Sequence, residues 1–393
     1  MKKVPLFRRF SVLVLVLCTC VFLLSAAAEE FDPSLLIVDD SIADQSRVED
    51  MIDMMTLHEK VCQLFFVQPE QFSNADRVTA YSKKLGNAVH RFPVGGIILF
   101  AANITRKDIA GLNAGLQQAA LDAGGIGLFI GVDEEGGGVS RVANSLRLRE
   151  KQPAPGKIGS PDQAYESGLV IASYLSEYGF NLDFAPVADV RSDIGNTEIT
   201  IRSYGSDPKS VARMVVRFME GLRENGVIPV LKHFPGHGAV SGNTHSGSGV
   251  SQKTLEEWRE TDFIPFTAGI KAGAEVVMVS HQLAVAVDPD RPASLSTKVI
   301  SLLREDLGFE GVVITDALRM GAVHDDYGTG EACILALEAG ADMLLLPYNF
   351  TNAYESVIQA VKDGRLTAER IDESVLRILS LKEQYGLLPL IPK

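Results

Sequence analysis

Cysteine is scarce in this chain, which has only four cysteines among its 393 residues. Cys18 and Cys20 lie within an apolar stretch near the N-terminus, so only Cys62 and Cys333 belong to the rest of the sequence. Two cysteines do not form a disulfide framework, and a chain of this length can bury a sufficient core without one. Small disulfide-stapled domains are therefore excluded. We expect Cys62 and Cys333 to be buried free thiols, with one disulfide between them as the alternative.

Basic residues are in the minority, because 37 Lys and Arg face 50 Asp and Glu, for a formal net charge of −13. The sequence also has no long basic stretch. Proteins that bind nucleic acids need a basic surface that attracts the phosphate backbone. The composition therefore argues against nucleic acid as a partner.

Long apolar runs are missing beyond the N-terminus, and no later run is long enough to span a bilayer. The chain begins with four basic residues, continues with an apolar stretch over residues 10–24, and then reads Ser-Ala-Ala-Ala up to Ala28. This order is typical of a secretory signal peptide, here residues 1–28, and the alternative is an uncleaved membrane anchor. Cleavage would change the formal charge from −13 to −17, because residues 1–28 contain four basic and no acidic residues. We expect a secreted or periplasmic protein without stable membrane insertion after cleavage.

Linkers, low-complexity tracts and repeats are also missing, which favours a single domain after a lead-in over residues 29–50. Eight short apolar runs recur with helical periodicity between them, as is typical of parallel strands buried on both faces. The runs are residues 63–67, 95–100, 127–133, 182–190, 227–234, 275–281, 311–316 and 342–347. Predicted helices include residues 161–178, 207–224, 254–273 and a last helix around 367–385. The sequence therefore predicts an α/β fold, a single (β/α)8 barrel of the TIM type over residues 51–388.

Polar residues follow five of these predicted strands at or just past their C-terminal ends. They are Asp133, Asp189, Lys232, His233, His281 and Asp316. In (β/α)8 barrels this face carries the active site. One such residue could equally be a satisfied buried group, but six of them converge on one face. The sequence therefore predicts a polar functional site there.

The segment KHFPGHGAVSGNTH, residues 232–245, contains three of the seven histidines of the chain. Its proline and glycine residues exclude a regular helix or a central strand. The apolar residues VIPVL, 227–231, lead into this segment and are expected to form a buried strand that delivers reactive side chains to the following loop. A zinc site built from His233, His237 and His245 is an alternative, but Pro235 denies the first two histidines a shared helical face. We therefore predict no metal and no organic cofactor.

Five motifs together resemble glycoside hydrolase family 3, and specifically its single-domain β-N-acetylglucosaminidases. The motifs are DEEGGGVSR (133–141), FAPVADV (184–190), IRSYGSDP (201–208), KHFPGHG with the later histidine (232–245), and PASLS through GVVITDAL (292–318). The resemblance covers about residues 50–388, and the KHFPGHG and GVVITDAL stretches are long and specific. It implies a retaining exo-β-N-acetylglucosaminidase that acts on β-linked N-acetylglucosaminides. Two-domain relatives, including many β-glucosidases, carry the acid/base in a second domain, and we expect no such domain here.

Asp316 matches the catalytic nucleophile of the family. A carboxylate at a strand end can attack an anomeric carbon and form a glycosyl-enzyme ester. The sequence by itself equally permits a helix N-cap, which is a frequent use of aspartate after a strand. The resemblance favours the role of nucleophile over that of helix N-cap for Asp316.

His245 matches the catalytic acid/base, which this branch of the family places on a mobile loop. A histidine can protonate the leaving oxygen and then take a proton from water. The family has an aspartate two residues earlier, where this chain has Asn243. Asparagine brings no charge to stabilise the imidazolium, and its amide can favour the wrong tautomer. The chain is therefore slower, tuned for another acceptor, or supplied with a different carboxylate, for which Glu134, Glu135 and Glu198 are candidates.

Five further residues match positions that hold the hydroxyl groups of the terminal sugar in the family. They are Asp133, Arg141, Arg202, Lys232 and His233. Aspartate accepts hydrogen bonds from vicinal hydroxyls, and arginine and lysine donate to hydroxyl oxygens. Asp189 and His281 suit a supporting role behind these residues, and the glycines at 136–138 are expected to let the backbone approach the sugar.

Two other functions remain open on the same fold. A β-N-acetylglucosaminide phosphorylase is one, because a neutral histidine acid/base repels phosphate less than a carboxylate does. A catalytically impaired sugar-binding protein is the other, with Asn243 as the sign of lost activity, although Asp316 argues against it. The prediction is a hydrolase of terminal N-acetylglucosamine in glycans or peptidoglycan fragments.

Overall fold

The computed structural model describes residues 40–192, 199–239 and 249–389, and it divides the chain into residues 1–47 and residues 48–393. The proposed signal peptide, Glu198, Asn243 and His245 lie outside the described residues. The second unit carries the fold and the candidate site.

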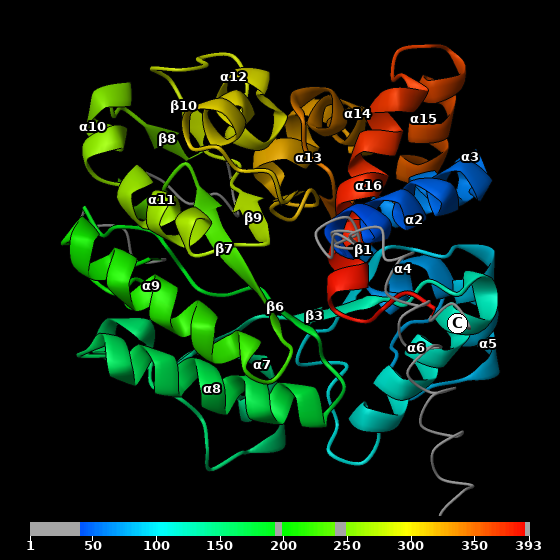
Figure 1. Ribbon diagram of the computed structural model, residues 1–393, viewed down its shortest axis with the longest axis horizontal. Helices are drawn as coiled ribbons and strands as arrows, with labels where there is room; N and C mark the ends of the chain where they lie inside the picture. Colours follow the sequence, from blue (N-terminus) through cyan, green and yellow to red (C-terminus); the bar gives the residue numbers. More distant parts are fainter. Residues whose placement is uncertain (1–39, 193–198, 240–248, 390–393) are drawn as a thin grey trace, which may run out of the picture. The chain divides into compact units, whose positions relative to one another are not determined.

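Eight parallel strands form one sheet, in the order β11-β9-β7-β6-β3-β2-β1-β12 (Figure 1). A parallel bridge between Ile314 and Met343 connects the two outer strands, so the sheet closes on itself. The strands are β1 (Phe65–Val67), β2 (Gly96–Ile98), β3 (Phe129–Val132), β6 (Leu182–Asp183), β7 (Ile228–Phe234), β9 (Val276–Val279), β11 (Val312–Thr315) and β12 (Leu344–Leu345). Each lies within one of the eight apolar runs, because a strand with helices on one face and the barrel interior on the other is buried throughout. The predicted (β/α)8 barrel is confirmed.

Two small pairings accompany the barrel. The antiparallel hairpin of β4 (Glu134–Gly136) and β5 (Val139–Ser140) follows β3 directly. The short strands β8 (Val250–Ser251) and β10 (Leu283–Ala284) pair in parallel.

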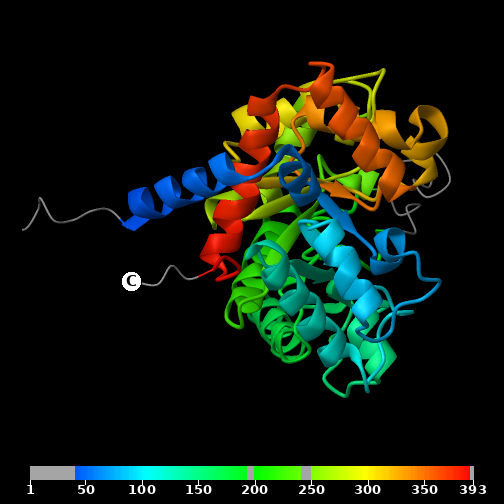
Figure 2. The ribbon, with the colours of Figure 1, turned by 90° about the vertical axis from the view of Figure 1, so that its right-hand side faces the viewer.

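Helices surround the sheet, as Figure 1 and Figure 2 show. The helices of the described part of the chain are α2 (Asp40–Met54), α3 (Leu57–Gln63), α4 (Pro69–Ser73), α5 (Lys83–Arg91), α6 (Ile109–Gly124), α7 (Arg141–Leu146), α8 (Pro161–Glu177), α9 (Pro208–Arg223), α10 (Leu255–Glu260), α11 (Phe263–Lys271), α12 (Thr297–Ser301), α13 (Gly321–Tyr327), α14 (Thr329–Ala339), α15 (Phe350–Lys362) and α16 (Ala368–Gln384). Short turns of 3₁₀ helix lie at Pro155–Lys157, His237–Ala239 and Ala293–Leu295, and a π-helical turn lies at Leu302–Asp306. Proline at the first helical position follows an N-cap side chain in α8 and α9, so local sequence sets where both begin.

One predicted helix was wrong, because residues 254–273 form two helices, α10 and α11. Thr261 leaves the helical conformation between them, and the next residue, Asp262, is buried. The Asp262 carboxylate forms an ion pair with Lys253. Helical periodicity does not reveal this break, because the ion pair at the break joins Asp262 to Lys253, which precedes α10.

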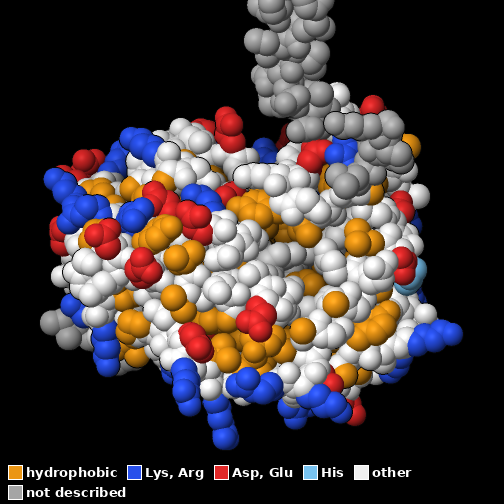
Figure 3. All heavy atoms as spheres, turned by 60° about the horizontal axis from the view of Figure 1, so that its bottom comes forward, with side chains coloured by type: hydrophobic (Ala, Val, Ile, Leu, Met, Phe, Trp, Pro, Cys, Tyr) orange, Lys and Arg blue, Asp and Glu red, His pale blue; other side chains and the backbone are white. Residues whose placement is uncertain are grey.

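Both cysteines outside the N-terminal stretch, Cys62 and Cys333, are buried and free, as expected. On the face drawn in Figure 3, hydrophobic side chains lie in small groups between basic and acidic ones. Within residues 40–192, 199–239 and 249–389, no helix has both the length and the apolar character needed to cross a membrane.

Candidate active site

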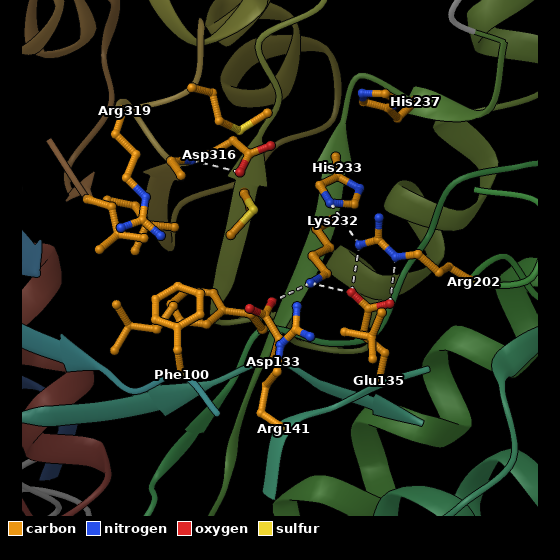
Figure 4. Close-up of a pocket in the computed structure, with 18 of the residues that line it drawn as sticks. Phe100, Asp133, Glu135, Arg141, Arg202, Lys232, His233, His237, Asp316 and Arg319 are labelled. Carbon is orange, nitrogen blue, oxygen red and sulfur yellow. Dashed lines mark hydrogen bonds and ion pairs between the residues drawn. The ribbon is translucent and has the colours of Figure 1, made fainter. Parts of the chain in front are cut away.

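A cavity of about 320 Å³ lies at the C-terminal ends of the barrel strands (Figure 4). That volume is at the lower end of the range for small-molecule sites. The polar and charged lining residues are Asp133, Glu135, Arg141, Arg202, Lys232, His233, His237, Asp316 and Arg319, and the apolar ones are Ile98, Phe100, Val139, Phe184, Ile199, Met278, Ala317, Met320, Leu345 and Leu346. The structure therefore brings six of the predicted site residues together around one cavity, although their roles stay predictions.

Asp316 lies directly after β11 and lines this cavity. Its Oδ1 accepts a hydrogen bond of 2.7 Å from the backbone N–H of Ala317. Burial raises the pKa of Asp316, but the imidazoles of His281 and His233 and the Ala317 N–H outweigh burial and hold the pKa below its ordinary value. The carboxylate is therefore ionised at neutral pH, as a nucleophile must be.

A network of four charged residues occupies the opposite wall: Asp133 directly after β3, Glu135 in β4, Lys232 in β7 and Arg202 in a loop. Lys232 Nζ lies 2.6 Å from Glu135 Oε1 and 3.0 Å from Asp133 Oδ1. The guanidinium of Arg202 binds Glu135 in a bidentate manner, with Nε 2.8 Å from Oε2 and Nη2 2.7 Å from Oε1. Burial raises the pKa of Glu135, but Arg202 and Lys232 outweigh it, and the net pKa is well below its usual range. The network holds donors and acceptors in fixed directions for sugar hydroxyl groups.

His233 is oriented by a buried aspartate behind it. Nδ1 of His233 donates to Asp189 Oδ2 over 2.7 Å, and the backbone N–H of His237 donates to Asp189 Oδ1 over 2.6 Å. Burial raises the pKa of Asp189, but the His233 ring outweighs burial and lowers the net pKa. Nε2 of His233 lies 3.5 Å from Nη2 of Arg202, whose positive charge disfavours a metal ion at that nitrogen. The geometry therefore argues against the zinc alternative.

His281 supports the segment that carries Asp316. Its Nε2 lies 3.0 Å from the carbonyl oxygen of Ala317, so Nε2 carries the proton and donates. Nδ1 then accepts from the hydroxyl of Ser294 over 2.7 Å. Burial lowers the pKa of His281, so this ring loses its proton more readily than an exposed histidine. This side chain is not part of the cavity lining, which agrees with the supporting role expected for it.

Arg141 also lines the cavity and begins α7. Its backbone N–H donates to the carbonyl oxygen of Asp133, which fixes the start of the helix beside β3. Its Nε is buried and makes no hydrogen bond within the part of the chain that the structure describes. A buried donor of this kind costs free energy unless a ligand satisfies it, which suits the predicted contact with a sugar.

Two of the three glycines expected to approach the sugar instead pack against another segment of the chain. Gly136 and Gly137 have positive φ angles of 96° and 60°. A Cβ at either would overlap the chain at Pro153 or Ala154, which packs against the hairpin of β4 and β5. These glycines therefore allow close packing of two backbone segments and do not face the cavity.

Glu134 and Glu135 were candidates to replace the family aspartate that stands where this chain has Asn243, and both are engaged in other contacts. Glu134 is fully buried and accepts from the backbone N–H groups of Val142 and Ala143 and from the hydroxyl of Tyr174. Glu135 is held by Lys232 and Arg202. Glu198, Asn243 and His245 lie outside the described residues, so the acid/base assignment stays a prediction.

Sequence reasoning missed three residues that define the cavity. Glu135, which was considered only as a substitute carboxylate, is the centre of the ion network. Arg319 and Phe100 form the wall across from it, with the guanidinium carbon 5.2 Å from the centre of the phenyl ring. Arg319 lies three residues after Asp316, so its nearness to the predicted nucleophile was the available signal.

Residues 56–381 match the family described as Glycosyl hydrolase family 3 N terminal domain. The beta-hexosaminidase LpqI of Mycobacterium tuberculosis (strain ATCC 25618 / H37Rv) is 32% identical over 344 residues, which cover 84% of this chain and 83% of that protein. The beta-hexosaminidase of Stenotrophomonas maltophilia (strain R551-3) is 35% identical over 264 residues, which cover 64% of this chain and 76% of that protein.

Solved structures agree with these sequence matches. A glycoside hydrolase family 3 beta-N-acetylglucosaminidase from Paenibacillus sp. str. FPU-7 superposes with a TM-score of 0.80 at 35% identity, over 86% of this chain. This chain spans 64% of the length of that protein. The structure of M. tuberculosis LpqI gives a TM-score of 0.75 at 30% identity, over 85% of this chain and 96% of that one. The chain therefore belongs to glycosyl hydrolase family 3 and is a glycoside hydrolase, as the motifs predicted.

Proposed function

We propose that the protein is a retaining exo-β-N-acetylglucosaminidase that releases terminal N-acetylglucosamine by double displacement. The observation that carries the proposal is the ionised Asp316 at one wall of the cavity, across from the network of Asp133, Glu135, Arg202 and Lys232. A sugar held by that network presents its anomeric carbon toward Asp316. The names of its relatives, beta-hexosaminidase and beta-N-acetylglucosaminidase, support the same reaction.

In the first step, Asp316 attacks the anomeric carbon from the α face and forms a glycosyl ester, while His245 protonates the departing oxygen. In the second step, His245 takes a proton from water, which attacks from the β face and breaks the ester. The β configuration is thereby retained, and no metal or organic cofactor takes part in this scheme.

Azide rescue of two variants tests these roles on an aryl β-N-acetylglucosaminide. Asp316→Ala opens the α face, so azide is expected to restore turnover and give the α-glycosyl azide. His245→Ala still forms the ester from a good leaving group, so azide attacks the β face and gives the β-glycosyl azide. An Asp316→Ala variant with wild-type turnover and no azide product would overturn the mechanism. Wild-type rates with and without phosphate separate hydrolysis from phosphorolysis.

Asn243 is proposed to slow the acid/base step, because it lacks the charge that stabilises an imidazolium. In a serine-protease triad the equivalent loss of charge costs about 10⁴ in turnover. We expect Asn243→Asp to raise kcat on an aryl glycoside, with Asn243→Ala as the control for loss of the amide. No gain from Asn243→Asp would show that the native residue does not limit the rate.

The proposed setting of the reaction is outside the cytoplasm, because residues 1–28 have the order of a secretory signal peptide. Terminal β-linked N-acetylglucosamine in extracytoplasmic glycans, including peptidoglycan fragments, is the proposed substrate. Fractionation of cells that express the full chain tests this location, and a product of unchanged N-terminus in the cytoplasm would contradict it.

A further inference from the structure

Arg319 stands out among the basic residues that line the cavity. Lys232 and Arg202 are each paired with carboxylates, whereas Arg319 forms no ion pair among the residues that the structure describes. Part of its side chain is exposed, and burial of the rest lowers the pKa of the guanidinium with no carboxylate to oppose that effect. The guanidinium nonetheless stays charged at any physiological pH.

Two neighbours hold the guanidinium in place. Nη1 of Arg319 donates to Gln68 Oε1 over 2.6 Å, and its planar group lies over the ring of Phe100. The backbone N–H of Arg319 donates to the carbonyl oxygen of Leu346. Stacking and one fixed hydrogen bond orient the group but leave its other N–H donors without a partner in the described part of the chain. A guanidinium held in this way can bind a carboxylate with little loss of side-chain entropy.

The position of Arg319 in the barrel places it away from the ion network. The ion network and His233 come from β7, from the end of β3 with the following β4, and from a loop. In the barrel, β3 and β7 are separated only by β6. Arg319, Leu346, Gln68 and Phe100 follow β11, β12, β1 and β2, which are neighbours on the other side. Figure 4 shows Arg319 and Phe100 on the left of the view and Lys232, Glu135, Arg202 and His233 on the right, with Asp316 between Arg319 and His233.

This arrangement decides which part of a substrate meets Arg319. In the proposed reaction the terminal sugar lies against the ion network, and its anomeric carbon lies at Asp316. The group beyond the glycosidic oxygen must therefore extend toward the outer part of the cavity, where Arg319 is exposed among apolar residues. We propose that Arg319 is a specificity-determining residue that binds a carboxylate on the leaving group. The proposal rests on the proposed function and adds the chemical class of the leaving group to it.

A pair of aryl glycosides of equal size tests the proposal. The 4-carboxyphenyl and 4-carbamoylphenyl β-N-acetylglucosaminides differ in charge and share nearly the same shape. The wild type is expected to favour the carboxylate over the amide by about tenfold in kcat/KM, because charge-assisted hydrogen bonds are stronger than neutral ones. Arg319→Gln should reduce this ratio to about one, Arg319→Lys should keep part of it, and high salt should lower the wild-type ratio.

The control is Arg213→Gln, which removes the same charge from an exposed position on α9 that does not line the cavity. It should keep the wild-type ratio. A wild type that cleaves neither glycoside contradicts the proposed function, whereas a wild type that cleaves both equally overturns only the role of Arg319. An equal loss on both glycosides in Arg319→Gln also overturns it, because that result places Arg319 against the terminal sugar.

A second comparison identifies the source of the carboxylate. One disaccharide carries the carboxylate on the reducing-end sugar, and the other carries it on a glycine joined to that sugar through an amide. A larger Arg319-dependent preference for the first assigns an acidic sugar, and a larger preference for the second assigns a peptide carboxylate. Loss of phosphate-dependent turnover in Arg319→Gln, without any effect on these pairs, would instead assign Arg319 to an inorganic phosphate acceptor and overturn the proposal.

Discussion

Buried carboxylates around this cavity differ in charge because their neighbours differ. Asp316 and Glu135 have cationic or donating groups that outweigh the effect of burial and keep their pKa values low. Glu134 and Asp183 lie one layer deeper, and burial raises the pKa of both. Asp316 and Glu135 are therefore ionised, while Glu134 and Asp183 gain a proton more readily.

Glu134 should give the stability of the protein a measurable pH dependence. Burial raises its pKa to about 7 in the folded protein, against an ordinary value of 4.5. Because the folded pKa is the higher one, the contribution of Glu134 is complete below pH 4.5 and is lost as the pH rises to about 7. The free energy of unfolding of the wild type, relative to Glu134→Gln, should fall by about 2.5 kcal/mol between pH 5 and pH 8.

Urea denaturation at a series of pH values measures this difference. Glu177→Gln, at an exposed position on α8, is the control for the loss of one carboxylate. Curves for the wild type and Glu134→Gln that run parallel over this range would contradict the assignment.

Glu135 should contribute more to stability than any exposed acidic partner of an arginine. Its side chain is 1% exposed, and Glu135→Gln leaves Lys232 and Arg202 with too little negative charge. We expect a loss of about 3 kcal/mol in the free energy of unfolding and a higher KM. Glu331→Gln breaks a pair with Arg365 in which both side chains are about 40% exposed, and it should cost less than about 1 kcal/mol. Equal losses in the two variants would show that burial does not set the strength of the network.

The turn after β7 is the element that connects the barrel to the proposed acid/base. The strand ends at Phe234, and residues His237–Ala239 form a 3₁₀ turn. Gly238 lies so close to the carbonyl oxygen of Val190 that a Cβ would overlap it. The backbone of this turn is therefore fixed against the segment after β6, just before the residues that carry Asn243 and His245.

Gly238→Ala should displace this turn and reduce kcat/KM by about 100-fold, since misplacement of about 1 Å can cost that much in catalysis. Gly111→Ala is the matched control, because Gly111 lies in α6 and a Cβ there would meet no atom of another segment within 4 Å. That change should raise the free energy of unfolding by about 0.5–1 kcal/mol and leave kcat/KM at the wild-type value. Steady-state kinetics and thermal unfolding of both variants separate the two effects.

At the scale of the whole molecule, the barrel closes where β11 meets β12. One side chain supports this seam, because Asp342 Oδ2 accepts from the backbone N–H of Val313 and from Arg304. Its Oδ1 accepts from Ser374 and Arg377 of α16. The last helix is thereby bound to the point at which the sheet closes.

Asp342→Ala should therefore lower the free energy of unfolding by about 3–5 kcal/mol, because it leaves the partly buried Arg304 and Arg377 without the fully buried carboxylate that pairs with them. Amide hydrogen exchange should accelerate first in β11 and β12. Asp306→Asn, in a pair with Arg259 whose side chains are 34% and 48% exposed, is the control and should cost less than about 1 kcal/mol. Unchanged exchange at the seam would contradict the role given to Asp342.

The sequence by itself determined the eight strands, the barrel and the face on which Asp133, Lys232, His233 and Asp316 lie. It could do so because an apolar run is a local property, and strand ends in a parallel barrel always meet at one face. Only the tertiary structure decided that Glu135 joins Lys232 to Arg202, that residues 254–273 break at Thr261, and that Arg319 lies over Phe100 with no carboxylate partner among the described residues. These features depend on contacts between segments far apart in the chain, which the local sequence pattern does not predict.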